Sequence, residues 1–348
     1  MARSAAFEAG VRPPSMPDGQ LSLFPGAAGT SPLTVLDERV RGTRFLTLPI
    51  RSILNSPEQT GMGFWSLNPY VGCEFGCAYC YARYTHRYVV ERVRSDGRLS
   101  PEIEGDRAIE GWEAFERRVF IKHGAERVLA RTLSPAKVGE RTIVIGTATD
   151  PYQPAERRFR VTRSVLERIA GFEGLSIGVI TKSPLVARDV DVLRTVSARH
   201  RVTIHMSLIT TDLPLIRLFE PRSPTPRVRL RALKRLVDAG LDAGLIVAPV
   251  LPGITDDLPH LDALMSAARA VGAKFVHPGP LRLYPPIRPL FLPIVERHFP
   301  QLSARYRAAY QGRGAAPKRY GRALIRRFHQ LERKYGFPVN DGMQDRYR

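Results

Sequence analysis

All three cysteines of this chain lie within eight residues, and their spacing constrains the fold more than any other feature. Cys73, Cys77 and Cys80 follow the pattern C-x3-C-x2-C inside the segment NPYVGCEFGCAYCYAR. Thiolates are soft ligands that favour iron–sulfur clusters, zinc or copper(I), and three of them so close together reach one centre only from a loop wrapped around it. The spacing therefore predicts a metal or cluster loop over residues 68–83.

Three cysteines suit some centres better than others. A structural zinc site needs four Cys or His ligands in paired spacing, and a disulfide framework needs an even number of cysteines. Three thiolates around a four-iron cluster leave one iron without a protein ligand. The pattern favours such a cluster, with a zinc-binding or chance group of buried cysteines as the alternative.

Beyond the cysteine loop, strand-like and helix-like runs alternate. Short runs rich in Val and Ile, such as LSIGVITK and RVTIHMSLI, are each followed by a longer run with helical periodicity. This alternation is typical of parallel βα units. The expected strands are residues 65–71, 142–148, 175–182, 201–209, 243–250 and 274–283.

Polar and chemically active residues stand where these strands end. The cysteines follow the first strand, residues 147–152 the second, Lys182 the third and Ser207 the fourth. Parallel barrels carry their reactive groups at the carboxyl ends of the strands. We therefore expect these residues to lie at one edge of the sheet, around the cysteine loop.

The cysteine loop resembles that of the radical S-adenosylmethionine (radical SAM) superfamily, where an aromatic residue precedes the third cysteine as Tyr79 does here. Further strings are similar to the branch containing spore photoproduct lyase and proteins labelled DNA repair photolyase. They are GTATDPYQPAE at 146–156, ITKSPLVARDVDVL at 180–193, FEPRSP at 219–224, VAPVLPGITD at 247–256 and LRLYPP at 281–286. The similarity spans roughly residues 45–336.

This resemblance implies an α/β fold built as an open, partial (βα)6 barrel over residues 43–285, since six units are too few for a closed barrel of eight strands. Residues 1–42 are rich in Gly, Pro, Ser and Ala and are expected to form a disordered or strap-like tail. Residues 286–348 are expected to form a basic, helical C-terminal extension.

The resemblance also implies the cofactors. Cys73, Cys77 and Cys80 would hold a 4Fe–4S cluster, and the methionyl group of S-adenosylmethionine would chelate the open iron. In the superfamily, reduction then cleaves the cofactor to a 5′-deoxyadenosyl radical that abstracts hydrogen from a substrate. A reducing electron donor such as flavodoxin or ferredoxin is expected as a partner.

Carried over to this chain, the resemblance assigns four residues to cofactor binding. Lys182 would hold the cofactor carboxylate and Ser207 would lie near its ribose, with an ordinary solvated lysine and strand serine as the alternatives. Gly146 would let the backbone approach the methionyl group. Asp150 would either orient a polar group of the cofactor or cap its own turn.

Tyr79 and Tyr81 flank Cys80 as two tyrosines do in the lyases, where they are thought to relay a radical. Stacking over the cluster is the alternative for Tyr79. The lyases also carry a hydrogen-donating cysteine after the second strand, but Thr147 stands in that neighbourhood here. Because a threonine O–H bond is too strong to give up hydrogen easily, the donor would be another group, such as Tyr81, or the reaction differs.

The net charge of +20 favours polyanionic partners, nucleic acid before an anionic membrane. We expect nucleic acid, DNA rather than RNA, although only 7 of the 53 basic residues are Lys, so the Arg bias can also reflect a genome rich in G and C. Near the C-terminus, Lys318 and Arg319 with the aromatic residues Tyr320 and Phe328 suit a phosphate backbone and a stacked base. A solvated helix face is the alternative.

The sequence thus predicts a radical SAM enzyme acting on nucleic acid, with lyase-like DNA repair favoured. The alternatives are an RNA- or protein-modifying radical enzyme, and a non-catalytic nucleic-acid-binding protein whose cysteines hold zinc or a labile cluster. The N-terminus lacks an apolar signal sequence, and no apolar run is long enough to span a membrane. Free thiolates also need a reducing compartment, so we expect a cytoplasmic protein without a membrane partner.

Overall fold

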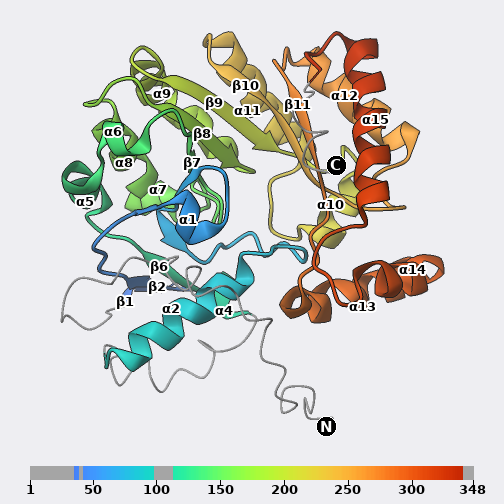
Figure 1. Cartoon of the computed structure of the whole chain (residues 1–348), viewed down its shortest axis with the longest axis horizontal. Coiled ribbons are helices and arrows are strands. Elements are labelled where there is room, and N and C mark those ends of the chain that lie inside the picture. Colours follow the sequence, from blue (N-terminus) through green and yellow to red (C-terminus); the bar gives the residue numbers. More distant parts are fainter. Residues whose placement is uncertain (1–34, 39–41, 98–112, 340–348) are drawn as a thin grey trace.

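A curved sheet of seven strands dominates the computed structural model, which describes residues 35–38, 42–97 and 113–339 (Figure 1). Six neighbouring strands run parallel, and the seventh pairs antiparallel at one edge. Across the sheet the order is β11 (Val276–Pro280), β10 (Asp242–Val250), β9 (Arg201–Ser207), β8 (Ser176–Thr181), β7 (Ile143–Ile145), β4 (Trp65–Leu67) and β3 (Leu54–Asn55). The six parallel strands confirm the predicted α/β fold.

Helices follow the strands and surround the outer side of the sheet (Figure 1). Between them and the strands lies one apolar core, in which Ile177, Ile204 and Leu245 are fully buried. Strands covered in this way are rich in Val, Ile and Leu on the covered face, which made their sequence runs recognisable. The helices are α5 (Ala125–Thr132), α6 (Pro135–Val138), α7 (Glu156–Phe159), α8 (Val161–Ile169), α9 (Val190–Ser197), α10 (Leu213–Phe219), α11 (Pro226–Asp238) and α12 (Leu258–Ala270).

The first expected strand, residues 65–71, is divided between two sheets. Its first part is β4, and its second part, β5 (Tyr70–Val71), pairs with β6 (Arg118–Ile121) in a separate sheet of four strands. Pro69 lies between the two parts and has no N–H to continue a ladder. The cysteine loop therefore leaves from the small sheet rather than from the barrel.

The small sheet has the order β1 (Val35–Glu38), β2 (Arg44–Thr47), β6, β5. It packs on α2 (Arg83–Ser95), which follows the cysteine loop, through an apolar cluster that includes Leu46, Phe120 and Val89. The short helix α4 (Ala114–Arg117) contacts β6 and α2 and belongs to this part, whereas the short helix α1 (Pro57–Thr60) contacts β4 of the large sheet. Strand β1 lies inside the segment expected to be a tail, and the other residues of that tail before 42 lie outside the described residues.

Beyond β11 the chain is helical. A short turn, η4 (Pro285–Ile287), leads to α13 (Arg288–His298), α14 (Pro300–Tyr310) and α15 (Lys318–Tyr335). Helix α15 lies against β11 and α12, so the extension closes one side of the open barrel. Of the helices in the described ranges, none combines the length and the apolar character needed to cross a membrane.

Candidate functional site

The cysteine loop connects β5 to α2 and takes its shape from contacts far away in the sequence. The N–H of Cys73 donates to the backbone oxygen of Phe115 at 2.7 Å. Gly72 and Gly76 have φ angles of +92° and +66°, which residues with a side chain rarely adopt. A Cβ on Gly72 would also lie 2.8 Å from the Phe115 oxygen, so the tight packing of the loop requires glycine there.

The three thiols are enclosed by this loop. Cys73 and Cys77 are buried, and Cys80 is partly exposed. Burial raises the pKa of the Cys77 thiol to about 12, and nearby Lys182 offsets part of that rise. A coordinated metal deprotonates such thiols outright. In the described ranges no three His, Cys, Asp or Glu side chains are grouped as ligands of a single metal ion.

Lys182 and Ser207, which follow neighbouring strands, meet beside the cysteine loop. The Lys182 ammonium donates to the Ser207 hydroxyl at 2.8 Å and to the Tyr79 hydroxyl at 3.2 Å. It also lies 3.1 Å from the carboxylate of Glu220, to which the Tyr79 hydroxyl donates. The structure thus brings two expected cofactor residues and one expected radical-relay tyrosine into a single cluster.

Glu220 is the centre of this cluster and was given no role by the sequence reasoning. It is fully buried and pairs with the equally buried Arg229 of α11. Burial alone would raise the pKa of Glu220, but Arg229 and Lys182 more than compensate and hold that pKa below its usual range. The carboxylate is therefore ionised and fixes the position of the Lys182 ammonium.

A signal for Glu220 did exist in the sequence, because it stands in the string FEPRSP at residues 219–224. The same string ties α10 to the cysteine loop, since the N–H of Ala78 donates to the oxygen of Phe219 at 2.9 Å. Arg229 gave no such signal. It is one of several arginines in α11, and only the fold shows which of them points inward.

Gly146 opens the turn after β7 with a φ of +97°. A Cβ there would lie 2.5 Å from the backbone oxygen of Ile180 and 2.6 Å from the ring of Pro151. Packing of this turn on β8 is thus enough to require glycine. The close approach to a cofactor that the sequence suggested stays a prediction.

Asp150 ties the same turn to the end of β8. One carboxylate oxygen accepts from the Thr181 hydroxyl at 2.6 Å and from the Tyr152 N–H at 2.9 Å, and the other accepts from the Lys182 N–H at 2.7 Å. These bonds correspond to the capping alternative. Through its bond to the Lys182 backbone, Asp150 also positions the residue whose ammonium faces the cysteine loop.

Tyr81 and Thr147, the possible donor and the residue in place of the donor cysteine, lie side by side. The Tyr81 hydroxyl donates to the backbone oxygen of Thr147. The Thr147 hydroxyl lies 2.5 Å from that of Ser66 and accepts from the amide of Asn68 at 3.0 Å. The Thr147 hydroxyl is thus held in a buried polar network. The Tyr81 hydroxyl contacts the backbone oxygen of Thr147, not its side chain.

The basic C-terminal residues lie on α15, apart from this cluster. Lys318 and Arg319 are exposed, and Tyr320 is partly buried. Phe328 is fully buried in the core, so the interpretation of Phe328 as a base-stacking residue is wrong. Its place in a helix with Leu324 and Leu331 gives it the buried face.

Sequence comparison finds relatives of this chain in Mycobacterium tuberculosis and Methanocaldococcus jannaschii. Protein Rv2578c of Mycobacterium tuberculosis is 32% identical over 296 residues, which cover 84% of this chain and 82% of that protein. Protein MJ0683 of Methanocaldococcus jannaschii is 27% identical over 190 residues, or 55% of this chain and 61% of that protein. Both relatives are described as uncharacterised.

Among solved structures, spore photoproduct lyase with bound S-adenosylmethionine and dinucleoside spore photoproduct has a similar fold. The TM-score is 0.54 at 14% sequence identity, covering 78% of this chain and 74% of the lyase chain. At that identity the likeness shows the fold alone. It agrees with the open barrel described above.

The Radical SAM superfamily matches residues 67–264, a segment that contains the three cysteines, Lys182 and Ser207. Proteins of this superfamily take S-adenosylmethionine and a 4Fe–4S cluster as cofactors, and three thiols on one loop fit a cluster with one open iron. Because the match extends over more than half of the chain, this protein belongs to the radical SAM superfamily.

Proposed function

We propose that this radical SAM enzyme abstracts hydrogen from a nucleic-acid substrate, with DNA favoured over RNA and a lyase-like repair reaction favoured over other outcomes. The observation that carries the proposal is the cluster of Tyr79, Lys182 and Ser207 at the strand ends beside the cysteine loop. The net charge of +20 supports a polyanionic substrate. The lyase of similar fold holds a dinucleoside, which supports the same class of substrate.

Each residue of the cluster has a role in this proposal. Beside this group of side chains, Cys73, Cys77 and Cys80 would hold the 4Fe–4S cluster, which together with S-adenosylmethionine would supply a 5′-deoxyadenosyl radical. The Lys182 ammonium binds the cofactor carboxylate, and the Ser207 hydroxyl binds a ribose hydroxyl. Because Glu220 and Ser207 already fix Lys182, little side-chain entropy is lost when the cofactor binds.

Tyr81 is the proposed hydrogen donor in place of the missing cysteine. Its O–H bond would break as a C–H bond forms on the substrate radical, which leaves the unpaired electron on Tyr81. Tyr79, on the other side of Cys80, would then give its O–H hydrogen atom to the Tyr81 radical, which restores the Tyr81 O–H bond and leaves the unpaired electron on Tyr79. A hydrogen atom from 5′-deoxyadenosine would restore Tyr79. The Glu220 carboxylate, which accepts from the Tyr79 hydroxyl, would keep this hydroxyl in place.

A second candidate is a radical reaction on RNA that needs no hydrogen donor of the lyase kind. The bonding of Thr147 favours it, because the turn that carries a donor cysteine in the lyases carries a hydroxyl engaged with Ser66 and Asn68 here. The substrate class would then be RNA with the same site residues.

The deciding experiment is anaerobic reconstitution with iron and sulfide, followed by reduction with S-adenosylmethionine and assay of 5′-deoxyadenosine. We expect the product from the wild type and none from Cys77→Ala. Deuterated DNA or RNA oligonucleotides then test the substrate, since deuterium should appear in 5′-deoxyadenosine with the correct nucleic acid. A complete cluster that forms no 5′-deoxyadenosine with either nucleic acid would contradict the proposal.

A further inference from the structure

A cavity of about 1410 Å³ lies in the C-terminal part of the protein, and no residue of the cysteine loop lines it. Its walls come from the loop after β10, the start of α12, helix α14 and the start of α15. The floor is apolar and includes Pro252, Leu258, Pro259 and Leu302. Leu258 is 57% exposed, which is unusual for a large apolar side chain and indicates a surface available for contact.

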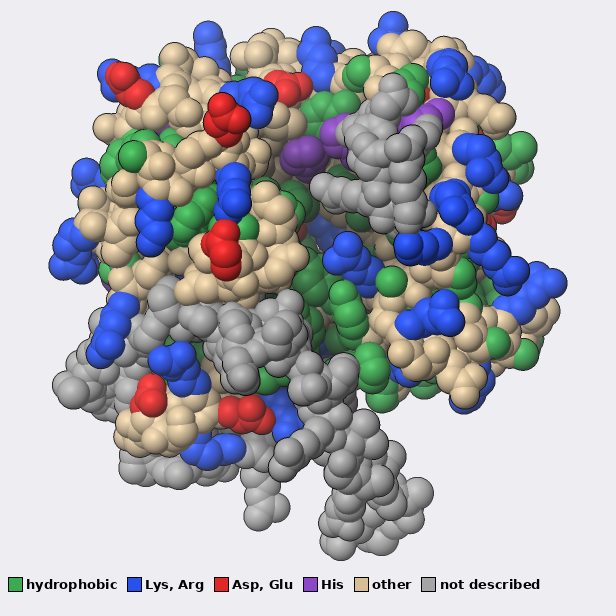
Figure 2. Space-filling model, in the orientation of Figure 1, with side chains coloured by type: hydrophobic (Ala, Val, Ile, Leu, Met, Phe, Trp, Pro, Cys, Tyr) green, Lys and Arg blue, Asp and Glu red, His purple; other side chains and the backbone are tan. Residues whose placement is uncertain are grey.

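The rim of this cavity is basic. Five Lys and Arg residues line it, against two acidic residues: Arg305, Arg313, Lys318, Arg319 and Arg327 against Asp256 and Asp257. Figure 2 shows Lys and Arg side chains gathered along the right-hand edge of the molecule, over α14 and α15.

The two acidic residues offset only part of this rim, since the Asp256 carboxylate lies 3.9 Å from the guanidinium of Arg327. Asp256 accepts from the N–H of Gly253 at 2.7 Å, and Asp257 caps α12 by accepting from the N–H of His260 at 2.9 Å. Within the described ranges, Arg305, Arg313 and Arg319 are in no ion pair. Three guanidinium groups without an acidic partner therefore line a cavity with an apolar floor, and this combination suits a ligand with spaced negative charges.

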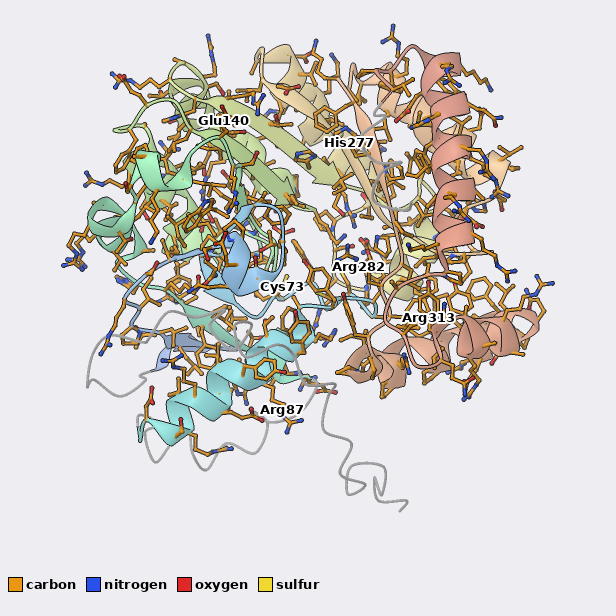
Figure 3. All side chains as sticks on the ribbon, viewed as in Figure 1. Cys73, Arg87, Glu140, His277, Arg282 and Arg313 are labelled. Atoms are coloured by element: carbon orange, nitrogen blue, oxygen red, sulfur yellow. The ribbon has the colours of Figure 1, made fainter. Side chains whose placement is uncertain are left out.

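The C-terminal cavity is joined to the candidate site by a short ladder. Arg282 forms a bridge with Ala315, and the N–H of Leu283 donates to the oxygen of Gly314 at 2.7 Å. The same segment, residues 313–316, contributes Arg313 to the cavity. In the view of Figure 3, Arg282 lies between Cys73 and Arg313.

The other strand of this ladder, which carries Arg282 and leads to Tyr284, lies near Tyr84 of α2. Burial raises the pKa of Tyr84 to about 12, and Tyr284 adds to the rise while Arg282 opposes it, so both residues lie near α2. The turn η4 also contacts α2. A positive, solvent-exposed path therefore leads from the candidate site over Arg282 to the cavity.

We propose that the C-terminal cavity binds a single-stranded segment of DNA that continues from the nucleotide held at the candidate site. Phosphates contact Arg305, Arg313 and Arg319, and a base lies on the apolar floor around Leu258. Alternating anionic and planar apolar groups match this lining, whereas a bilayer surface does not fit into a concave site. This inference rests on the proposed nucleic-acid function.

The test compares two triple variants of the full-length, reconstituted protein by fluorescence anisotropy with a labelled single-stranded oligodeoxynucleotide of about 12 nucleotides. One carries Arg305→Gln, Arg313→Gln and Arg319→Gln. The control carries Arg227→Gln, Arg231→Gln and Arg235→Gln, which remove the same charge from an exposed face of α11. Formation of 5′-deoxyadenosine without DNA should be unchanged in both.

We expect the cavity variant to bind at least about tenfold more weakly, and its plot of log affinity against log salt to flatten by about 2 for three lost phosphate contacts. The control should lose much less. A further variant, Leu258→Glu, places an acidic residue at a helix N-terminus, where it does not destabilise the fold, and should also weaken binding.

Equal binding by the two triple variants would overturn the inference. If DNA still donates deuterium to 5′-deoxyadenosine in that case, the proposed function stands and only the cavity assignment fails. If the wild type binds no DNA and no RNA, both fail. If the cavity variant loses binding only to vesicles of phosphatidylcholine and phosphatidylserine, the cavity is a membrane site and the inference is wrong.

Discussion

Charged side chains are buried and paired in one region of this protein, whereas in another they are exposed and some have no acidic partner among the described residues. Around the cysteine loop, Glu220, Arg229 and Lys182 are buried or nearly so and pair with one another. Around the C-terminal cavity, Arg305 and Arg319 are exposed and have no acidic partner among the described residues. Buried charge must be paired to be tolerated, whereas exposed charge need not be. The first region is thus arranged to hold a fixed geometry, and the second to attract an anion.

The largest expected effect separates the two regions completely. Cys77→Ala removes one of three thiol ligands, so we expect the cluster and 5′-deoxyadenosine formation to be lost. Oligonucleotide binding at the C-terminal cavity should remain, because no cysteine lines it. Iron content and visible absorbance measure the cluster, the assay of 5′-deoxyadenosine measures the reaction, and anisotropy measures oligonucleotide binding. Loss of oligonucleotide binding in parallel with iron would show that the two regions are not independent.

Replacement of one arginine in each region tests the contrast in burial. Arg229→Leu leaves Glu220 buried without its partner, and the free energy of unfolding should fall by about 3–5 kcal/mol. Arg319→Leu, in the exposed region, should change it by less than about 0.5 kcal/mol. Urea denaturation of both variants measures the difference. Similar values for the two would mean that the buried pair does not stabilise the fold.

Burial should also determine how strongly a histidine makes the stability of the protein depend on pH. Burial lowers the pKa of His86 to about 4, and its ring contacts the oxygen of Arg118 at 2.7 Å. The unfolded chain, with an ordinary pKa of 6.5, then binds more protons than the folded chain between these values. Stability should therefore fall as the pH drops from 6.5 to 4, by up to about 3 kcal/mol.

Two histidine variants isolate this effect by urea denaturation across that pH range. His86→Leu should lose stability less steeply with acid than the wild type does. His298→Leu, at an exposed position of α13, should follow the wild type. An unchanged slope in His86→Leu would assign the acid sensitivity to other groups, such as His205, whose pKa burial also lowers to about 4.

The smallest expected effects concern cofactor affinity. Loss of a charged hydrogen bond in Lys182→Met should raise the dissociation constant for S-adenosylmethionine about 10- to 100-fold, as measured by calorimetry. Ser207→Ala removes a neutral bond and should cost only a few-fold, about 1 kcal/mol. Lys318→Met serves as the control in the exposed region. Equal affinities in Lys182→Met and the control would remove Lys182 from the cofactor site.

Much of the fold was predictable because the parallel strands are rich in Val and Ile and each is followed by a run with helical periodicity. The runs that became β8, β9 and β10 were recognised for this reason, and the residues at their ends were located with them. The assignment of β6 to a second sheet was not predictable. An apolar run such as VFIK indicates a strand but not its neighbours, and its partners β2 and β5 lie far from it in the sequence.

The site was predictable where a motif marked it and hidden where only packing did. The cysteine spacing and the strand-end positions pointed to Lys182 and Ser207, which the structure brings together. The string FEPRSP marked the segment that holds Glu220 but not the role of this residue, which comes from contacts with Tyr79 and Arg229 that appear only after folding. Long-range pairing of this kind cannot be read from local sequence patterns.

The bond between Cys73 and Phe115 has a consequence for how the enzyme matures. The loop obtains its shape from a segment about forty residues further along the chain, next to β6 of the small sheet. Until β6 has formed, the contact with Phe115 is missing, and the three thiols would lie on a loop without a defined shape. Cluster insertion should therefore follow folding of the small sheet, unlike the zinc finger, in which the metal itself drives folding. Only molecules in which the small sheet has folded would then receive a cluster.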